Sequence, residues 1–243
     1  MNISHKHKTI WWAPERCGTK AVGKILSEFG FTYYEDSTEK KLMKNEKGEI
    51  YQSHNIVIPE KYNDYKVICS IRNPYDRVFS LYLNFTSVGK TSVYIKSEYQ
   101  LFKEKFGFFV EELFTFQKVK SVFNFPILEG KGILNNYVLK YNFNGRLPDQ
   151  FIRMENMVED MSKIEFIRES ELWSNGFIEQ YLNNNQYINV RPYSFSKMYE
   201  LEIAKKVYNQ HKKHFILCNY NPFSFTANEL TNEEKMNFLH GIL

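Results

Sequence analysis

Residues 67–82 read VICSIRNPYDRVFSLY, and this stretch joins an apolar segment, a polar turn and an amphipathic segment. Val67–Ile71 is uncharged and rich in β-branched residues, which is typical of a buried strand. Pro74 suits the first turn of a helix, and apolar residues recur at helical spacing from there to Phe85. The stretch therefore predicts a buried strand that leads directly into a helix.

The same order occurs near the N-terminus. Thr9–Trp12 is a short apolar run, Ala13–Gly18 is turn-like, and a helical pattern follows from Thr19 to Phe29. Gly30 is the expected end of that helix, and Gln150–Met154 has the pattern of a third strand. Repeated strand–loop–helix units are typical of α/β proteins. We therefore expect an α/β fold with a central, mainly parallel sheet.

Further helices are expected at Glu98–Phe116, within Glu155–Ile164, over Phe195–Phe215 with a break near His211, and from Thr231. The histidines other than His54 suggest no site. His5 and His7 are expected in a disordered terminus, and His211, His214 and His240 are expected on a helical surface.

Composition limits the possible functions. A length of 243 residues fits one domain over residues 1–243. A net charge of +4 suits a locally bound anion and is too small for a dedicated nucleic-acid binder. Three widely spaced cysteines give no zinc or disulfide pattern. There is no apolar stretch long enough for a signal peptide or a membrane span. We expect a cytoplasmic protein without bound metal; the oligomeric state stays open.

The turn before the first helix is a candidate anion site. The first turn of a helix presents unpaired N–H groups and the positive end of its dipole. Gly18 lets the backbone approach an anion, Thr19 adds a hydroxyl, and Arg16 and Lys20 add charge. The alternative is an ordinary turn in which Thr19 caps the helix and both cations lie on the surface. The Walker spacing G-x-x-x-x-G-K-[ST] is absent.

The second turn adds Arg72 at the end of a buried strand, where a charge needs a partner. A guanidinium can bind two phosphate oxygens at once, and Ser80 lies about two turns into the following helix. In the alternative, Arg72 pairs with a carboxylate of the protein, and Ser80 is a small residue at a helix contact.

Together, PERCGTK (14–20) and IRNPYDRVFSLY (71–82) resemble the two nucleotide-binding motifs of sulfotransferases that use 3′-phosphoadenosine 5′-phosphosulfate (PAPS). The resemblance extends to FIRMENMVED (151–160) and to the C-terminal stretch of the carbohydrate sulfotransferase branch, which starts here at Arg191. It implies a three-layer fold with a P-loop-like phosphosulfate-binding loop. The implied donor is PAPS, and the acceptor is a hydroxyl or amine of a carbohydrate or small metabolite.

The resemblance also implies residue roles. Arg72 and Ser80 hold the 3′-phosphate, and Arg191 lies in a loop over the nucleotide. The phosphosulfate loop comprises Arg16, Cys17, Gly18, Thr19, Lys20 and Ala21. The sequence departs from the family pattern at Glu15, where proline is usual, and at Lys20, where threonine is usual.

The candidate catalytic residues are His54 and Arg16. His54 lies upstream of the Arg72 strand, as the catalytic histidine does in the cytosolic branch of the family. An imidazole can be neutral and basic near pH 7, whereas Arg16 can stabilise the leaving phosphate. Glu15 and Glu35 are alternative bases. The rival functions are a magnesium-dependent kinase of a small molecule and a nucleotide-binding module of this fold without catalysis.

Overall fold

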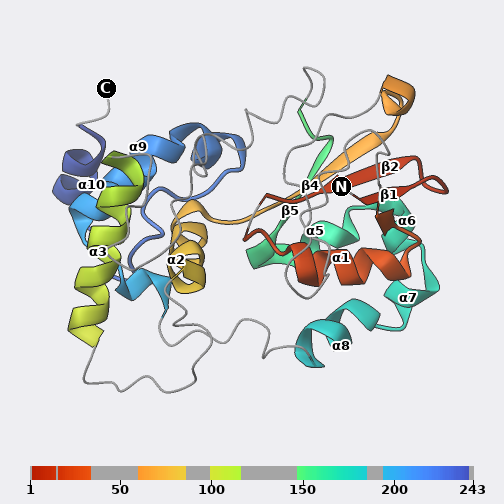
Figure 1. The fold of residues 1–243 in the computed structure, drawn as a ribbon, viewed down its shortest axis with the longest axis horizontal. Helices are drawn as coiled ribbons and strands as arrows, with labels where there is room; N and C mark the ends of the chain where they lie inside the picture. The colour runs from red at the N-terminus through yellow and green to blue at the C-terminus, as the bar shows by residue number, and fades with distance from the viewer. Residues whose placement is uncertain are drawn as a thin grey trace. The chain divides into compact units, whose positions relative to one another are not determined.

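The structure is a computed structural model that describes residues 2–14, 16–33, 60–85, 99–115, 147–184 and 194–240. The contacts divide the chain into two compact units (Figure 1). The first takes Met1–Arg72 and Val138–Gln186, and the second takes Asn73–Tyr137 and Tyr187–Leu243. A single domain over the whole chain stays a prediction.

The first unit contains a five-stranded sheet in the order β3-β1-β2-β4-β5. Its strands are β1 (Asn2–Ser4), β2 (Thr9–Trp12), β3 (Thr32–Tyr33), β4 (Lys66–Ile71) and β5 (Gln150–Arg153). The pairs β2–β4 and β4–β5 are parallel, whereas β1 is antiparallel to both β2 and β3. Four strands therefore run in one direction, and the predicted α/β class with a mainly parallel sheet is confirmed.

Helices lie along one face of this sheet (Figure 1). They are α1 (Thr19–Glu28), η4 (Met154–Asn156), α5 (Met157–Ser162), α6 (Glu165–Arg168), α7 (Glu171–Ser174) and α8 (Phe177–Asn184), while η1 (Glu60–Tyr62) precedes β4. Trp11, Ile68 and Ile152 from the sheet share a buried core with these helices. Trp11 Nε1 also donates to Ser70 Oγ at 2.8 Å. The described part of this unit has no helix on the other face, so the third layer stays a prediction.

The N-terminal residues are ordered, contrary to expectation. Asn2–Ser4 forms β1, and residues 5–8 form the turn of a β-hairpin with β2. His7 stacks on Phe166, with ring centroids 4.1 Å apart. A three-residue strand is too short to give a recognisable alternation in sequence, which explains why β1 was missed.

The predicted end of α1 is confirmed. Gly30 has φ +79°, a left-handed conformation that favours glycine. Its N–H donates to Ser27 C=O at 3.1 Å, and Phe31 N–H donates to Leu26 C=O at 3.2 Å. These bonds satisfy carbonyl groups at the end of the helix.

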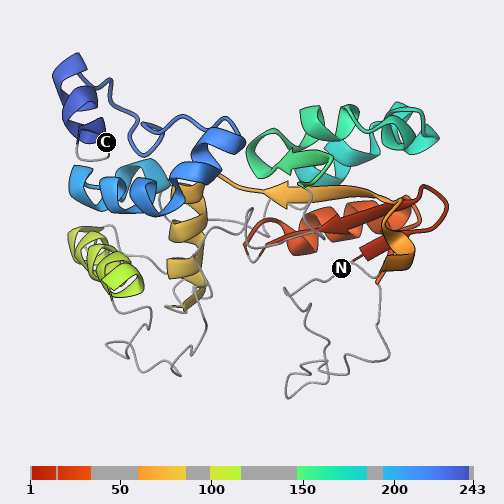
Figure 2. The same cartoon turned by 90° about the horizontal axis from the view of Figure 1, so that it is seen from above.

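The second unit is helical in its described part (Figure 2). It contains α2 (Pro74–Phe85), α3 (Tyr99–Thr115), η6 (Phe195–Lys197), α9 (Leu201–Leu217) and α10 (Asn232–Leu239). Aromatic rings fill its core, as where Phe106 packs edge-on against Tyr199 with centroids 5.0 Å apart. The buried Tyr199 hydroxyl donates to Tyr75 C=O at 2.7 Å. Much of the aromatic content of the chain thus serves this core.

Helix α9 corrects two expectations. It continues without a break through His211, and His211 and His214 are buried at 1% and 3% exposure. Both lie on the buried face of α9, which also carries Val207 and Phe215.

Burial keeps these two imidazoles uncharged. Burial is the larger cause, and the charge of Arg77 the smaller one, that lower the pKa of His214 to about 3. The same causes, with His214 added, hold the pKa of His211 well below 6.5. Neutral imidazoles are compatible with a core, since no isolated charge is desolvated.

Candidate functional site

The candidate site lies at the carboxyl edge of the parallel strands in the first unit. Strand β2 ends at Trp12, and residues 13–18 lead from there into α1. The neighbouring strand β4 ends at Ile71, beside Arg153 of β5. In open α/β sheets, ligands bind outside the carboxyl ends of the strands. The predicted phosphate loop is therefore in the position where such a sheet binds ligands.

The N-terminus of α1 is open to an anion. Gly18 is the N-cap, with φ 77° and ψ 21°, and no side chain makes a capping hydrogen bond. The first turn contains no acidic residue, and the N–H groups of Thr19, Lys20 and Ala21 belong to the part of a helix that lacks intrahelical acceptors. Gly18, and not Thr19, is therefore the N-cap, whereas Lys20 is exposed at the surface, as the alternative of an ordinary turn expected. The positive end of the helix dipole is not compensated by a carboxylate of its own first turn.

Gly18 is also held by close packing. A Cβ atom on Gly18 would overlap Sδ of Met154, the first residue of η4. The strand-to-helix segment that follows β5 thus lies directly against Gly18 at the start of α1. Because Sδ lies near the end of a flexible side chain that can move, the left-handed backbone is the main requirement for glycine here.

Arg72 links the two predicted motifs within the first unit. It is 9% exposed, and its Nη1 donates to the main-chain carbonyl of Arg16 at 3.1 Å. Arg16 has φ +65°, a left-handed conformation that is uncommon for residues with a side chain. Such backbone strain is concentrated at functional sites. The end of β4 is therefore in direct contact with the β2–α1 loop.

Cys17 shapes this loop from inside. Its side chain is fully buried, and its N–H donates to Pro14 C=O at 3.1 Å. This bond closes a turn of the loop. Because the Cys17 N–H donates to Pro14, it is not available to an anion in this conformation.

The other predicted site residues lie in the second unit or outside the described residues. Ser80 is buried on α2 and belongs to the second unit. His54 and Arg191 lie outside the described residues, as do Glu15 and Glu35.

An ion-pair network beside the loop was missed from the sequence. Arg153 ends β5, and its Nε and Nη2 each donate to Asp160 at 2.8 Å. Arg153 N–H donates to the same carboxylate at 2.9 Å, and Lys163 Nζ approaches at 3.1 Å. Burial by itself would raise the pKa of Asp160, but these bonds outweigh it and lower the pKa. A signal did exist, because an arginine at the end of a strand needs a carboxylate partner.

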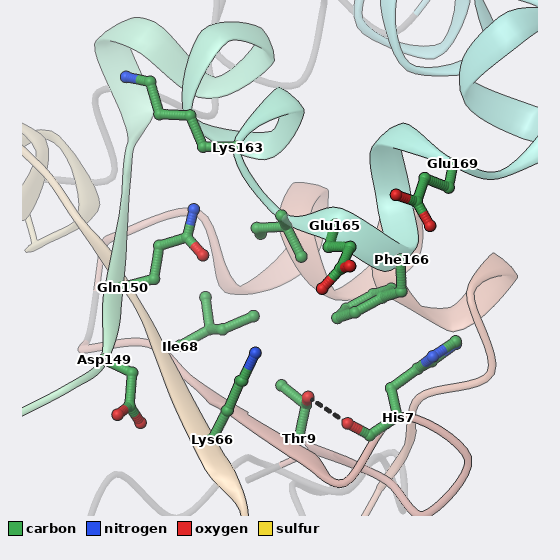
Figure 3. A pocket seen from close by; sticks show the side chains of 11 residues that line it. His7, Thr9, Lys66, Ile68, Asp149, Gln150, Lys163, Glu165, Phe166 and Glu169 are labelled. Carbon is green, nitrogen blue, oxygen red and sulfur yellow. Dashed lines mark hydrogen bonds between the residues drawn. The ribbon is translucent and has the colours of Figure 1, made fainter.

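A pocket of about 400 Å³ lies at the opposite, amino edge of the parallel strands (Figure 3). Thr9, Lys66 and Gln150, the first residues of β2, β4 and β5, line it together with residues of α6. It was not predicted from the sequence. Because it lies across the length of the sheet from Gly18 and Arg72, it is not part of the candidate phosphate site.

No protein-family model, no curated protein and no solved structure matches this chain. Among the described residues, none of the helices is long and apolar enough to cross a membrane. The same residues contain no group of three or more potential metal ligands.

Proposed function

We propose that this protein is a PAPS-dependent sulfotransferase with a three-layer, P-loop-like fold. It transfers a sulfuryl group to a hydroxyl or amine of a carbohydrate or small metabolite in the cytoplasm. One observation carries the proposal: the Arg72 guanidinium donates to the carbonyl of Arg16, beside the uncapped N-terminus of α1. Two segments that resemble nucleotide-binding motifs, 56 residues apart, therefore meet at the edge of the sheet where phosphates bind.

The roles follow from the chemistry of the residues. First-turn N–H groups of α1 bind the 5′-phosphosulfate, and Arg72 provides a fixed positive charge for the 3′-phosphate together with Ser80. Arg191 adds a further cation over the nucleotide. Arg16 stabilises the negative charge that develops on the leaving 5′-phosphate.

Proton transfer is assigned to His54. As the acceptor oxygen or nitrogen bonds to sulfur, the bond from sulfur to the 5′-phosphate oxygen breaks, and the imidazole takes the acceptor proton. A base of this kind contributes about 10²- to 10⁴-fold to the rate. The reaction releases adenosine 3′,5′-bisphosphate and needs no metal ion.

Nucleotide preference tests the binding half. We expect adenosine 3′,5′-bisphosphate to raise the melting temperature more than ATP with magnesium, because a ligand stabilises the state that binds it. In calorimetry, Arg72→Ala should weaken binding about tenfold to hundredfold, since a charged hydrogen bond contributes about 1.5–3 kcal/mol. Arg168→Ala removes an exposed arginine of α6 and should leave the affinity unchanged. If Arg72→Ala and the wild type bound adenosine 3′,5′-bisphosphate with equal affinity, Arg72 would not be part of the nucleotide site.

Turnover tests the catalytic half. With labelled PAPS and a panel of sugars and small metabolites, His54→Ala should keep the affinity for adenosine 3′,5′-bisphosphate and lose at least about a hundredfold in rate. His240→Ala, in which an exposed histidine is removed, is the control. A wild-type rate in His54→Ala would assign the base elsewhere. A preference for ATP with magnesium would favour the kinase, and nucleotide binding without transfer would favour the non-catalytic module.

A further inference from the structure

The pocket at the amino edge of the sheet has the size of a small-molecule site. Its volume of about 400 Å³ falls within the range of about 300–1,000 Å³ that is typical of ligand pockets. Ile68 of β4 and Ile164, which precedes α6, also line it, but each is only 3% exposed and belongs to the core beneath the pocket. Because all its lining residues are described and belong to the first unit, the pocket can be considered by itself.

Most charged groups on its walls already have partners in the protein. Asp149 accepts a hydrogen bond from Val67 N–H at 2.7 Å. Lys163 pairs with Glu159 and Asp160, and Glu169 pairs with Arg168 at 3.4 Å. These groups line the pocket, but their charges are already paired or hydrogen-bonded within the protein.

Lys66 and Glu165 are different. Within the described part of the chain, neither the Lys66 ammonium nor the Glu165 carboxylate forms a hydrogen bond or ion pair, with each other or with another residue. Figure 3 shows that they extend into the same space, Lys66 from the start of β4 and Glu165 from the start of α6. The pocket therefore presents one positive and one negative group on facing sides.

Beside these two charged groups, the pocket has an aromatic wall formed by His7 and Phe166. His7 and Phe166 stack with centroids 4.1 Å apart and ring planes 13° apart. Partial burial is the larger cause, and the charge of Lys6 the smaller one, that lower the pKa of His7 below 6.5. The stacked imidazole is therefore neutral at pH 7. The partly exposed ring of Phe166 offers apolar contact to a ring or branched chain.

We propose that this pocket binds a small zwitterion with an apolar body, of the class of aromatic amino acids. Its carboxylate pairs with Lys66, its ammonium group pairs with Glu165, and its ring lies against Phe166. Both unpaired charges and the apolar surface between them are then used by one ligand. This assignment is independent of the proposed sulfotransferase activity, because none of these residues lies at the carboxyl edge of the sheet.

The test is a ligand-observed NMR titration of the full chain with L-phenylalanine. Saturable binding is expected, and glycine, which lacks the apolar body, should bind far more weakly. Lys66→Gln should weaken L-phenylalanine and 3-phenylpropionate about twofold to fivefold, as the loss of one exposed ion pair predicts, and leave phenethylamine unchanged. Glu165→Gln should weaken L-phenylalanine and phenethylamine and leave 3-phenylpropionate unchanged.

Lys24→Gln and Glu28→Gln are the matched controls, because they remove an exposed ion pair on α1. They should alter none of these affinities. All four substitutions are at exposed positions, and circular dichroism checks that each variant is folded. The proposal is overturned by an absence of saturable binding. It is also overturned if Lys66→Gln and Glu165→Gln weaken all three ring compounds equally, or change none of them.

Discussion

Gly18 occupies a left-handed backbone position that disfavours a side chain, and a Cβ atom there would displace the flexible end of the Met154 side chain. Its φ of +77° lies in the left-handed region, and a Cβ atom would overlap Sδ of Met154. Both effects should destabilise Gly18→Ala, by about 2 kcal/mol in the free energy of unfolding. Urea unfolding followed by circular dichroism measures this loss.

The control for this prediction is Gly107→Ala. Gly107 lies within α3 and has open space where its Cβ would be, so alanine there should stabilise the helix by about 0.5–1 kcal/mol. Adding Met154→Ala to Gly18→Ala should recover the part of the loss due to overlap and leave the part due to backbone strain. If Gly18→Ala were as stable as the wild type, the close packing of this loop would be refuted.

The local chemistry of the loop was predictable from sequence, but its neighbours were not. Strand, glycine, threonine and basic residues follow one another, so a helix N-terminus suited to an anion could be inferred from residues 9–20 alone. Met154 and Arg72 are distant in the chain, and their contacts with the loop depend on the pairing of β2, β4 and β5. Sequence gives no distance between such segments, so only a resemblance connected Arg72 with Gly18.

The junction of β5 and α5 depends on one buried carboxylate. Asp160 is 3% exposed and accepts three hydrogen bonds from Arg153 and one from Lys163. We expect Asp160→Asn to lower the free energy of unfolding by about 2–3 kcal/mol, because it removes the buried charge that binds the Arg153 guanidinium at two points, whereas the exposed Glu159 that remains lies at 4.0 Å. The measurement is urea unfolding at pH 7.

Glu159→Gln is the matched control on the same helix. Glu159 is an exposed partner of Lys163 and lies 4.0 Å from Arg153 Nη2, so the loss of its charge should change the free energy of unfolding by less than about 1 kcal/mol. A similar effect from both substitutions would mean that the buried pair has no special structural role.

At the level of elements, sequence periodicity worked best where an element was long or bounded by a clear signal. Gly30 ended α1 as expected, and the helix after Thr231 begins with a capping box in which Thr231 and Glu234 bond reciprocally. It failed for β1, which has three residues, and for the histidines of α9. A histidine fits either face of an amphipathic pattern, so its burial depends on tertiary packing that sequence does not show.

The whole molecule brings together groups that no local pattern relates. The amino-edge pocket combines His7, Lys66 and Glu165 from three separate parts of the chain. Sequence analysis placed His7 in a disordered terminus and singled out neither of the other two residues. Candidate residues at the carboxyl edge could be proposed from the sequence because each group lies in one contiguous loop, whereas the pocket depends on the packing of helices against a sheet.

Buried histidines should determine how the molecule responds to mild acid. His214 has a pKa of about 3 in the folded chain, against about 6.5 when unfolded. The unfolded chain therefore binds more protons between these values, and the stability present above pH 6.5 is lost as the pH falls. Each such histidine contributes up to about 1.4 kcal/mol per pH unit, or about 2 kcal/mol between pH 6.5 and 5.

Urea unfolding followed by circular dichroism at pH 7.5 and 5 tests this. The wild type should lose more stability between the two values than His214→Gln, by about 2 kcal/mol. His240→Gln, at an exposed position, should behave as the wild type. Asp160 does not interfere, because its pKa is lowered and its contribution is lost only below about pH 4. His7 and His211 stay in both proteins, and His214 is the smallest of the three causes that lower the pKa of His211, so the difference reports mainly on His214. An equal loss in both proteins would mean that His214 is not buried.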